Sequence, residues 1–349
     1  MLVFSQHGPS LFVERLTGGF FIGDFLSSTY NRPHLSVADQ LALVKQRGLS
    51  VSDDATALSY LRRLGYYRLS AYWFPLRAKT LTTVGGKLVR QVSNNFVPGA
   101  TFQSAVDLYV FDKALRMLVV DALERIEVAI RVDVAHYLGQ VDTFAQVKPN
   151  LLHGHFSRKV QARSGMTKHA EWLVKLDLLT EKSKEDFVSH YKNSYGLPLP
   201  IWVSIEVWDF GLLSNFFAGM LETDKRALAQ RFGVPDPAVM ESWLRTLNYV
   251  RNLAAHHSRL WNRNMIDQPK MPSAGDIPMF DPVLATINVA RPYASLCIIS
   301  YLMKQICPNS SWQARMVNLF SRFPEVPAPP TDISATGCQP GWEREGFWQ

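Results

Sequence analysis

Cysteine is scarce in this chain, and long hydrophobic runs are missing from it. The 349 residues include three cysteines, Cys297, Cys307 and Cys338, and no CxxC pair. This composition argues against a disulfide scaffold or a structural zinc site, and it fits a reducing cytoplasm. The longest strongly apolar run lies between Arg291 and Lys304 and has twelve residues, whereas a membrane-spanning helix needs about 20. We therefore expect no membrane partner.

Several motifs of common enzyme classes are also missing. The sequence contains no P-loop, no GxGxxG and no GxSxG, so it offers no support for a nucleotide cofactor or for serine hydrolase chemistry. His153 and His155 are two residues apart, but no cysteine or acid lies near them at ligand spacing. We expect these histidines to be exposed in a basic loop, and we expect no metal and no cofactor.

Acidic residues are missing from two stretches of a chain whose net charge is +7. Neither 55–106 nor 143–170 contains an Asp or Glu, although both contain several cations. Such a charge distribution is typical of a surface that binds a polyanion. The sequence therefore predicts RNA contacts from Arg62, Arg63, Tyr66, Tyr67, Arg68, Arg77, Lys79, Lys87, Arg90, Arg158, Lys159 and Arg163.

Aromatic side chains are interleaved with the cations of the first stretch. They include Tyr60, Tyr66, Tyr67, Tyr72, Trp73 and Phe74. Exposed aromatic rings can stack on unpaired bases, but aromatics at this spacing more often belong to a core. We expect most of them to be packed, with one or two tyrosines exposed.

Hydrophobic periodicity divides the chain into four regions and predicts a mainly α fold. Residues 1–32 form a loosely ordered leader, and 33–100 form a basic, aromatic-rich helical region with two short helices that meet at Gly65. A β-hairpin is predicted around the Gly85-Gly86 pair. Residues 101–323 form a helical bundle, with helices over 101–138, 202–221, 237–264 and 281–323, the second of them interrupted near Gly211. Residues 324–349 are rich in Pro, Gly and Ser and are expected to form a flexible tail.

The predicted helix over 237–264 separates its polar and apolar residues by face. At 100° per residue, one face carries Arg245, Asn248, Asn252, His256, Arg259 and Arg263. The opposite face carries Trp243, Leu247, Val250, Ala254 and Trp261, and should be buried. An imidazole among fixed cations can act as an acid or base, and the neighbouring arginines can bind a phosphate. A solvated helix face remains the alternative. We expect His257 to be a packed histidine with a structural role.

This helix also carries a recognisable string, RNLAAHHSRLWNR. It resembles the signature of the Abi-like abortive-infection proteins of the AbiD/AbiF type, which belong to the HEPN superfamily. The segments HLSVADQLALVKQRGLSV, LGYYRLSAYWFPLR, LYVFDKALRMLVVDALERIEVAIR and LPIWVSIEVWDFGLLS are similar to that family as well. The resemblance spans about 34–320 and implies a HEPN-type helical bundle with an N-terminal helical extension.

The resemblance further implies a metal-independent endoribonuclease that leaves a 2′,3′-cyclic phosphate and acts in antiphage defence in the bacterial cytoplasm. Its catalytic residues would be Arg251, Asn252 and His256, supported by Asn248, Arg259 and Arg263. Family members commonly build the site between two copies of the chain and associate with a structured noncoding RNA, so we expect a homodimer and an RNA partner. The alternative is a noncatalytic RNA-binding scaffold that has kept the fold.

Other polar residues have simpler interpretations. Glu127 and Arg131 form an i,i+4 pair in the favourable order, which indicates an ion pair that stabilises a helix; a role in orienting the site is the alternative. We do not expect the Arg131–His136 spacing to mark a second catalytic motif, because His136 points away from Glu127. Glu206 and Asp209 lie in an apolar segment, where burial would require a salt link to an arginine.

Overall fold

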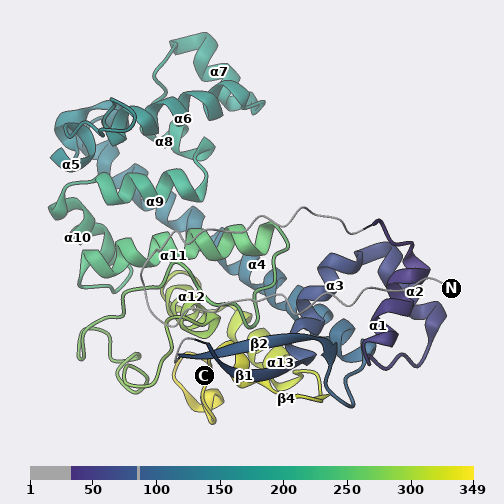
Figure 1. The fold of residues 1–349 in the computed structure, drawn as a ribbon. Helices are drawn as coiled ribbons and strands as arrows, with labels where there is room; N and C mark the ends of the chain where they lie inside the picture. Colours follow the sequence, from purple (N-terminus) through teal and green to yellow (C-terminus); the bar gives the residue numbers. More distant parts are fainter. Residues whose placement is uncertain (1–32, 85–86) are drawn as a thin grey trace. The chain divides into compact units, whose positions relative to one another are not determined.

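The computed structural model describes residues 33–84 and 87–349 (Figure 1). The predicted leader at 1–32 lies outside the described residues. The described residues are mainly α-helical and contain the predicted hairpin, together with a second, very short pair of antiparallel strands. Two compact units divide the chain. The first comprises residues up to 112 together with 323–332, and the second comprises 113–322 and 333–349. The division falls inside a long helix rather than at residue 100.

The first unit is built from short helices and the hairpin. Its elements are α1 (Val37–Gln46), α2 (Asp54–Leu64), α3 (Tyr66–Trp73), β1 (Arg77–Val84), β2 (Lys87–Phe96), the start of α4 (Phe102–Val141), β3 (Val326–Pro327) and β4 (Pro330–Thr331). Ser36 caps α1 by accepting a hydrogen bond from the backbone of Asp39. Gly65, at a φ of 81°, separates α2 from α3 as predicted, because glycine adopts positive φ without steric cost.

Aromatic packing in this unit matches the expectation from the sequence. Tyr72 and Trp73 are buried, whereas Tyr67 is 82% exposed. The Tyr72 hydroxyl donates to Asp112 Oδ2 at 2.7 Å, which satisfies both buried polar groups. The hairpin pairs β1 with β2 in antiparallel register, with Thr82 opposite Val89.

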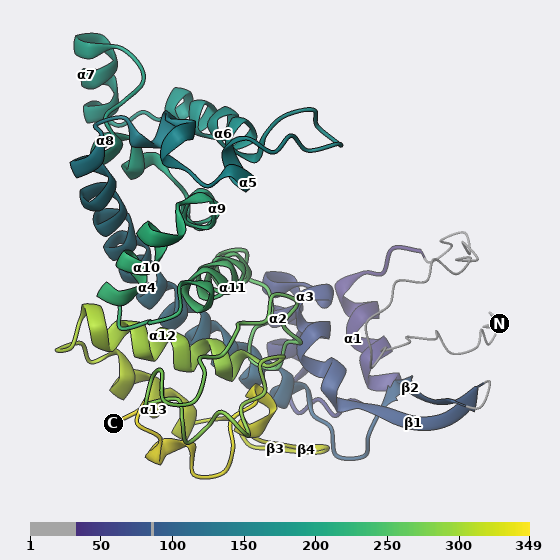
Figure 2. The same cartoon turned by 90° about the vertical axis from the view of Figure 1, so that its left-hand side faces the viewer.

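The second unit holds the rest of α4 and the remaining helices. They are α5 (Gly154–Ser157), α6 (Lys168–Lys182), α7 (Asp186–Tyr195), α8 (Ile201–Ser204), α9 (Phe210–Gly219), α10 (Glu222–Arg231), α11 (Pro237–Ala255), α12 (Pro292–Ile306) and α13 (Trp312–Ser321). In Figures 1 and 2, α11 lies between α9 and α12, and it packs on both. Trp243, Val250 and Trp261 are buried, as the apolar face predicts. Within the described residues, no helix has the length and apolar character needed to cross a membrane.

Three predicted helices differ from the structure. The helix expected over 202–221 is interrupted at 205–209, between α8 and α9, rather than near Gly211. The helix expected over 237–264 ends at Ala255, and the segment 281–291 is a series of turns before α12. The C-terminal segment is also not a flexible tail, because Trp342, Phe347 and Trp348 are buried. Its polar groups are satisfied too, since Trp348 Nε1 donates to the Tyr293 hydroxyl at 2.8 Å. These large aromatic rings outweigh the local Pro and Gly content from which the flexible tail was predicted.

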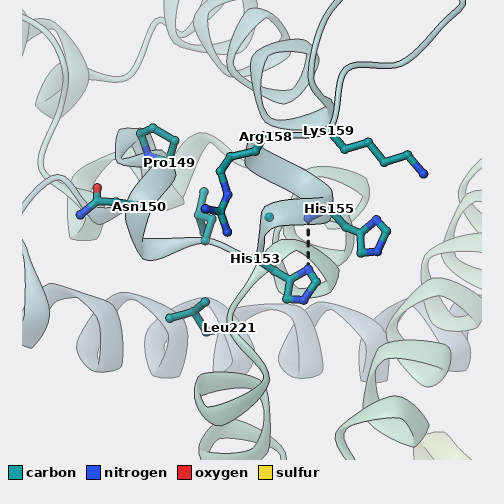
Figure 3. Close-up of a pocket in the computed structure, with 9 residues that line it drawn as sticks. Pro149, Asn150, His153, His155, Arg158, Lys159 and Leu221 are labelled. Carbon is teal, nitrogen blue, oxygen red and sulfur yellow. Dashed lines mark hydrogen bonds between the residues drawn. The ribbon is translucent and has the colours of Figure 1, made fainter.

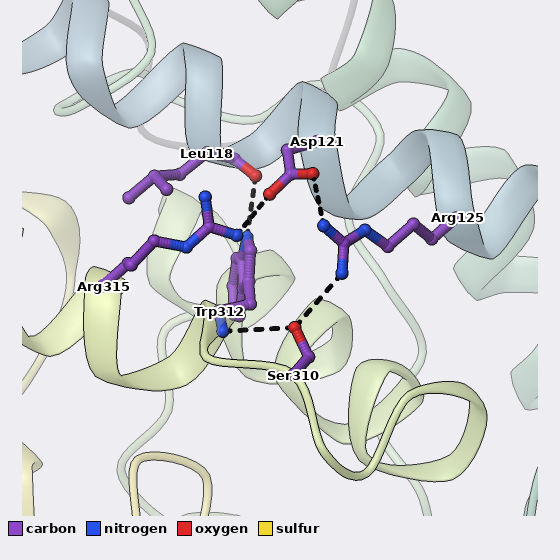
Figure 4. Close-up of polar contacts among 6 residues, drawn as sticks. All are labelled: Leu118, Asp121, Arg125, Ser310, Trp312 and Arg315. Atoms are coloured by element: carbon purple, nitrogen blue, oxygen red, sulfur yellow. Dashed lines mark hydrogen bonds and ion pairs between the residues drawn. The ribbon is translucent and has the colours of Figure 1, made fainter.

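A polar cluster joins α4 to α13 (Figure 4). Asp121 accepts hydrogen bonds from Arg125, at 2.8 Å, and from Arg315. Trp312 Nε1 donates to the backbone oxygen of Leu118 at 2.7 Å. Partial burial works to raise the pKa of Asp121, but the hydrogen bonds and charges of the two arginines outweigh it and lower that pKa. The cluster is a partly exposed ion-pair network with a structural role.

Candidate active site

The turn that ends α11 positions the two consecutive histidines. The backbone N–H of His257 donates to Ala254 O at 3.1 Å, and that of Ser258 donates to Leu253 O at 2.9 Å. This pair of bonds is a Schellman motif, which places its central residue in the left-handed region and usually requires glycine there. Here that residue is His257, with a φ of 59°. Both His256 and His257 are exposed, so the expectation of a packed His257 is wrong.

A buried arginine donates a hydrogen bond to the backbone of this turn. Arg116 on α4 is 5% exposed and donates from Nη1 to Ser258 O at 3.4 Å. Arg116 is not among the residues predicted from the sequence. It lies next to Leu115 on the buried stripe of α4, one turn after the buried Asp112. Because such a buried cation needs acceptors, Arg116 fixes the backbone that follows His256.

The predicted catalytic arginine and asparagine lie together on the polar face of α11. Arg251 Nη1 donates to Asn252 Oδ1, and Asn252 Nδ2 donates to Asn248 Oδ1, each at 3.4 Å. All three side chains are partly buried. The backbone N–H of His256 donates to Asn252 O at 3.0 Å. The His256 side chain is therefore attached at the C-terminal end of the helix that carries this row. The contacts are long, and they leave donor capacity for a ligand.

Glu127 and Arg131 form the predicted ion pair on α4, and the structure adds a neighbourhood to it. Glu127 is 7% exposed, and Arg131 Nη2 donates both to Glu127 Oε1 and to the backbone oxygen of Trp208. Burial raises the pKa of Glu127, against the lowering effect of the positive charges of Arg131 and Arg251 and with a smaller raising effect of Asp209. The carboxyl group is thus within electrostatic reach of the motif arginine, and perturbed carboxyl groups of this kind are typical of functional sites.

The loop before α9 closes the other side of this cluster. Asp209 is exposed and caps α9, accepting a hydrogen bond from the backbone of Leu212 at 2.7 Å. Glu206 is also exposed. The expectation that burial forces these two acids into salt links is therefore wrong. At Gly211, an added Cβ would lie 3.1 Å from Asp209 Oδ1 and 3.7 Å from the Asn248 amide. Glycine thus allows the backbone of α9 to approach α11 closely.

The supporting residues are not all where a continuous helix would place them. Asn248 belongs to the row on α11, but Arg259 and Arg263 follow the helix and lie in the loop beyond it. Arg263 Nε donates to the hydroxyl of Tyr249 at 3.1 Å, which returns this loop to α11. The sequence pattern places both arginines on the helix because a Schellman turn formed by histidine has no sequence signal as clear as glycine.

The remaining candidates separate into exposed and internal groups. Arg62, Arg63, Arg68 and Lys79 are exposed in the first unit, where Tyr66 and Arg77 are partly buried, and Arg158, Lys159 and Arg163 are exposed in the second. The side chains of Lys87 and Arg90 lie outside the described part of the structure.

His136 is exposed, and His169 is buried with Nε2 at 2.8 Å from Gln146 O. Burial lowers the pKa of His169, which indicates a neutral structural histidine.

The geometry therefore brings together the Arg251 guanidinium, two amides and a buried carboxyl group, with an exposed imidazole next to them. This set can bind an anionic group and move a proton. Across residues 33–84 and 87–349, no group of three or more His, Cys, Asp or Glu side chains could hold a metal ion.

Comparison with known proteins identifies the family of this chain. The family model for Abi-like proteins matches residues 59–262, which is more than half of the chain and ends just beyond the His256 turn. The comparisons found no similar protein among the curated proteins and no similar fold among the solved structures. On the family match, the chain belongs to the family of Abi-like proteins, whose role is in abortive infection.

Proposed function

We propose that this protein is a HEPN-type, metal-independent endoribonuclease that acts in abortive infection. The observation that carries the proposal is the row of Asn248, Arg251 and Asn252 on α11, which lies beside the buried Glu127 and ends at the exposed His256. Each member has a chemical use in cleaving a phosphodiester without a metal.

In the proposed reaction, His256 accepts the proton of a ribose 2′-OH. The 2′-oxygen forms a bond to phosphorus while the bond from phosphorus to the 5′-oxygen breaks, and the leaving oxygen takes up a proton. The products are a 2′,3′-cyclic phosphate and a 5′-OH. Arg251 binds the non-bridging phosphate oxygens and stabilises the charge that develops on them. Glu127 does not touch the substrate; it positions Arg251 and Arg131 from behind.

We also propose that two copies of the chain complete the site. Arg251 is partly buried next to Glu127, whereas His256 is exposed beyond the end of the helix. An exposed imidazole from one copy can approach the arginine of another. Mixing Arg251→Ala protein with His256→Ala protein tests this arrangement, because mixed dimers regain one complete site. Failure of the mixture to regain any cleavage, when both proteins are shown to exchange subunits, contradicts a shared site.

Arg62, Arg63 and Arg68 form the second part of the proposal, a surface that holds a structured RNA. All three are exposed on α2 and α3, and Tyr67 beside them is exposed as well. Replacing the three arginines with alanine should weaken RNA binding and reduce its dependence on salt, because fewer counterions are released. Unchanged affinity and salt dependence in a filter-binding series would place the RNA-holding surface elsewhere.

Incubation of the purified protein with RNA in EDTA tests the activity. We expect cleavage products with 2′,3′-cyclic phosphate ends, and we expect His256→Ala to abolish cleavage while its thermal midpoint stays nearly unchanged, since the side chain is exposed. Cleavage that stops in EDTA and returns with a divalent ion contradicts the metal-independent mechanism. Binding of RNA without cleavage supports the alternative, a noncatalytic RNA-binding scaffold.

A further inference from the structure

Two cavities of the second unit share His153 and His155, and together they extend from α5 to the loop before α9; we call them the groove. Its first part is a cavity of about 850 Å³ lined by Asn150, His153, His155, Arg158 and Lys159 over an apolar floor that includes Leu221 (Figure 3). None of the described residues that line this part is acidic. Its volume is in the range of sites for nucleotide-sized ligands, and its charge selects an anion.

The cationic side chains of this part are arranged by their own backbone. The rings of His153 and His155 are stacked, with centroids 5.5 Å apart and planes at 9°. The backbone N–H of His155 donates to His153 Nδ1 at 3.2 Å, so the proton of a neutral His153 ring is on Nε2. Figure 3 shows the Arg158 side chain extending into the space between Asn150 and His153. Arg158 folds back over Gly154, where an added Cβ would lie 2.8 Å from Nη2.

The second part of the groove continues from the same two histidines. It is a cavity of about 760 Å³ that shares His153 and His155 with the first part and extends to Asp209 and Gly211. Gly211 lies beside Asn248 of the site, since a Cβ added to it would be 3.7 Å from the Asn248 amide. Charges of both signs line this part. They include Lys225, which is paired with Glu241 at 2.9 Å. The net positive charge of the groove is thus concentrated at the end beside α5.

We propose that this groove guides a single strand of RNA, with one of its phosphates held by Arg158 and Lys159, toward the site at Arg251. The inference rests on the proposed function and names the path of its substrate. A strand, rather than a free phosphate, accounts for a groove with its cations at one end and its other end beside a candidate phosphodiester-cleaving site.

Binding of a labelled oligouridine of about 12 nucleotides, a length typical of single-strand sites, tests this path. All proteins carry His256→Ala so that the probe stays intact. We expect the added pair Arg158→Ala and Lys159→Ala to weaken binding about tenfold and to reduce the salt slope by about 0.7, the value for one lost phosphate contact on a single strand. The control pair is Lys182→Ala with Lys184→Ala, two exposed cations of the same unit. It should change the affinity less than about twofold, as expected for cations that do not contact the strand.

A second variant keeps every charge. Gly154→Ala should displace the Arg158 guanidinium and weaken binding with little change in the salt slope. Equal loss of affinity in the Lys182/Lys184 control, or no loss in the Arg158/Lys159 variant, overturns the path. Displacement of the probe by inorganic phosphate or uridine monophosphate as effectively as by unlabelled strand also overturns it in favour of a small phosphate ligand. Cleavage by the unsubstituted protein, measured in parallel, separates failure of the groove from failure of the proposed activity.

Discussion

Two acid–arginine pairs lie six residues apart on α4 and share one sequence pattern. Asp121 pairs with Arg125, and Glu127 pairs with Arg131, each at i,i+4. The first pair is partly exposed and joined by Arg315, and the pKa of its carboxyl group is lowered. The second is buried beside Arg251, and the pKa of its carboxyl group is raised, chiefly by burial.

The difference shows that a charge pattern on a helix does not determine what the charges do. Around Asp121, the hydrogen bonds and charges of two arginines outweigh partial desolvation and favour the ionised form, and the cluster ties α4 to α13. Around Glu127, desolvation exceeds the attraction of two arginines, which leaves a carboxyl group whose protonation responds to its neighbours. Only the second environment is next to the motif of α11.

Removal of each carboxyl group should give the largest contrast in stability. Glu127→Ala leaves the largely buried Arg131 without its anion and should destabilise the fold by about 3 kcal/mol. Asp121→Ala removes a partly exposed pair and should cost no more than about 1 kcal/mol. Urea unfolding of both variants measures the two values. Equal losses would remove the distinction between the clusters.

Acidity should move the two clusters in opposite directions. The folded-state pKa of Asp121 is below its unfolded value, so its contribution is present at neutral pH and is lost as the pH falls below about 4. The folded-state pKa of Glu127 is above its unfolded value, so the folded state gains stability as the pH falls from that raised pKa toward the unfolded value near 4.3.

The measurement is the thermal midpoint of the unsubstituted protein relative to Asp121→Asn and Glu127→Gln across pH. Relative to Glu127→Gln, the unsubstituted protein should gain stability on mild acidification. Relative to Asp121→Asn, it should change little until strongly acidic pH. If acidification changed the relative thermal midpoint in the same direction in both comparisons, the environments assigned to Asp121 and Glu127 would be contradicted.

The smallest expected effect concerns the turn that follows the Arg251 row. His257 adopts a φ of 59°, a conformation that costs an L-residue about 1 kcal/mol relative to glycine. His257→Gly should therefore raise stability by about 1 kcal/mol or less, whereas His257→Ala should not. Urea unfolding distinguishes them. A stabilised His257→Gly protein with reduced cleavage would show that the strained turn serves the position of His256.

Much of the fold follows from local sequence. The break at Gly65, the cap at Ser36 and the buried face with Trp243 and Val250 all have local physical causes. The end of α11 does not, because a histidine rather than a glycine adopts the left-handed conformation at residue 257. Local sequence also did not predict that the C-terminal segment is ordered, since Phe347 and Trp348 are buried by residues distant in the sequence.

The candidate site was predictable only in part, for the same reason. Helical spacing placed Asn248 and Asn252 on one face, whereas Arg251 was predicted from the resemblance to the Abi-like family. The burial of Glu127 and the support from Arg116 depend on tertiary packing that no local pattern encodes. Charge alone located Arg158 and Lys159, but the groove that contains them required the structure.

A comparison of RNA cleavage by Glu127→Gln and Asp121→Asn tests the central claim most directly. Both substitutions remove one charge with little change of shape, and both proteins are compared at temperatures well below their thermal midpoints. We expect Glu127→Gln to lower kcat at least about tenfold with a smaller change in KM, because positioning of Arg251 acts in the transition state, and we expect Asp121→Asn to cleave like the unsubstituted protein. Equal activity of all three proteins would contradict the assignment of the Glu127–Arg251 cluster as the active site.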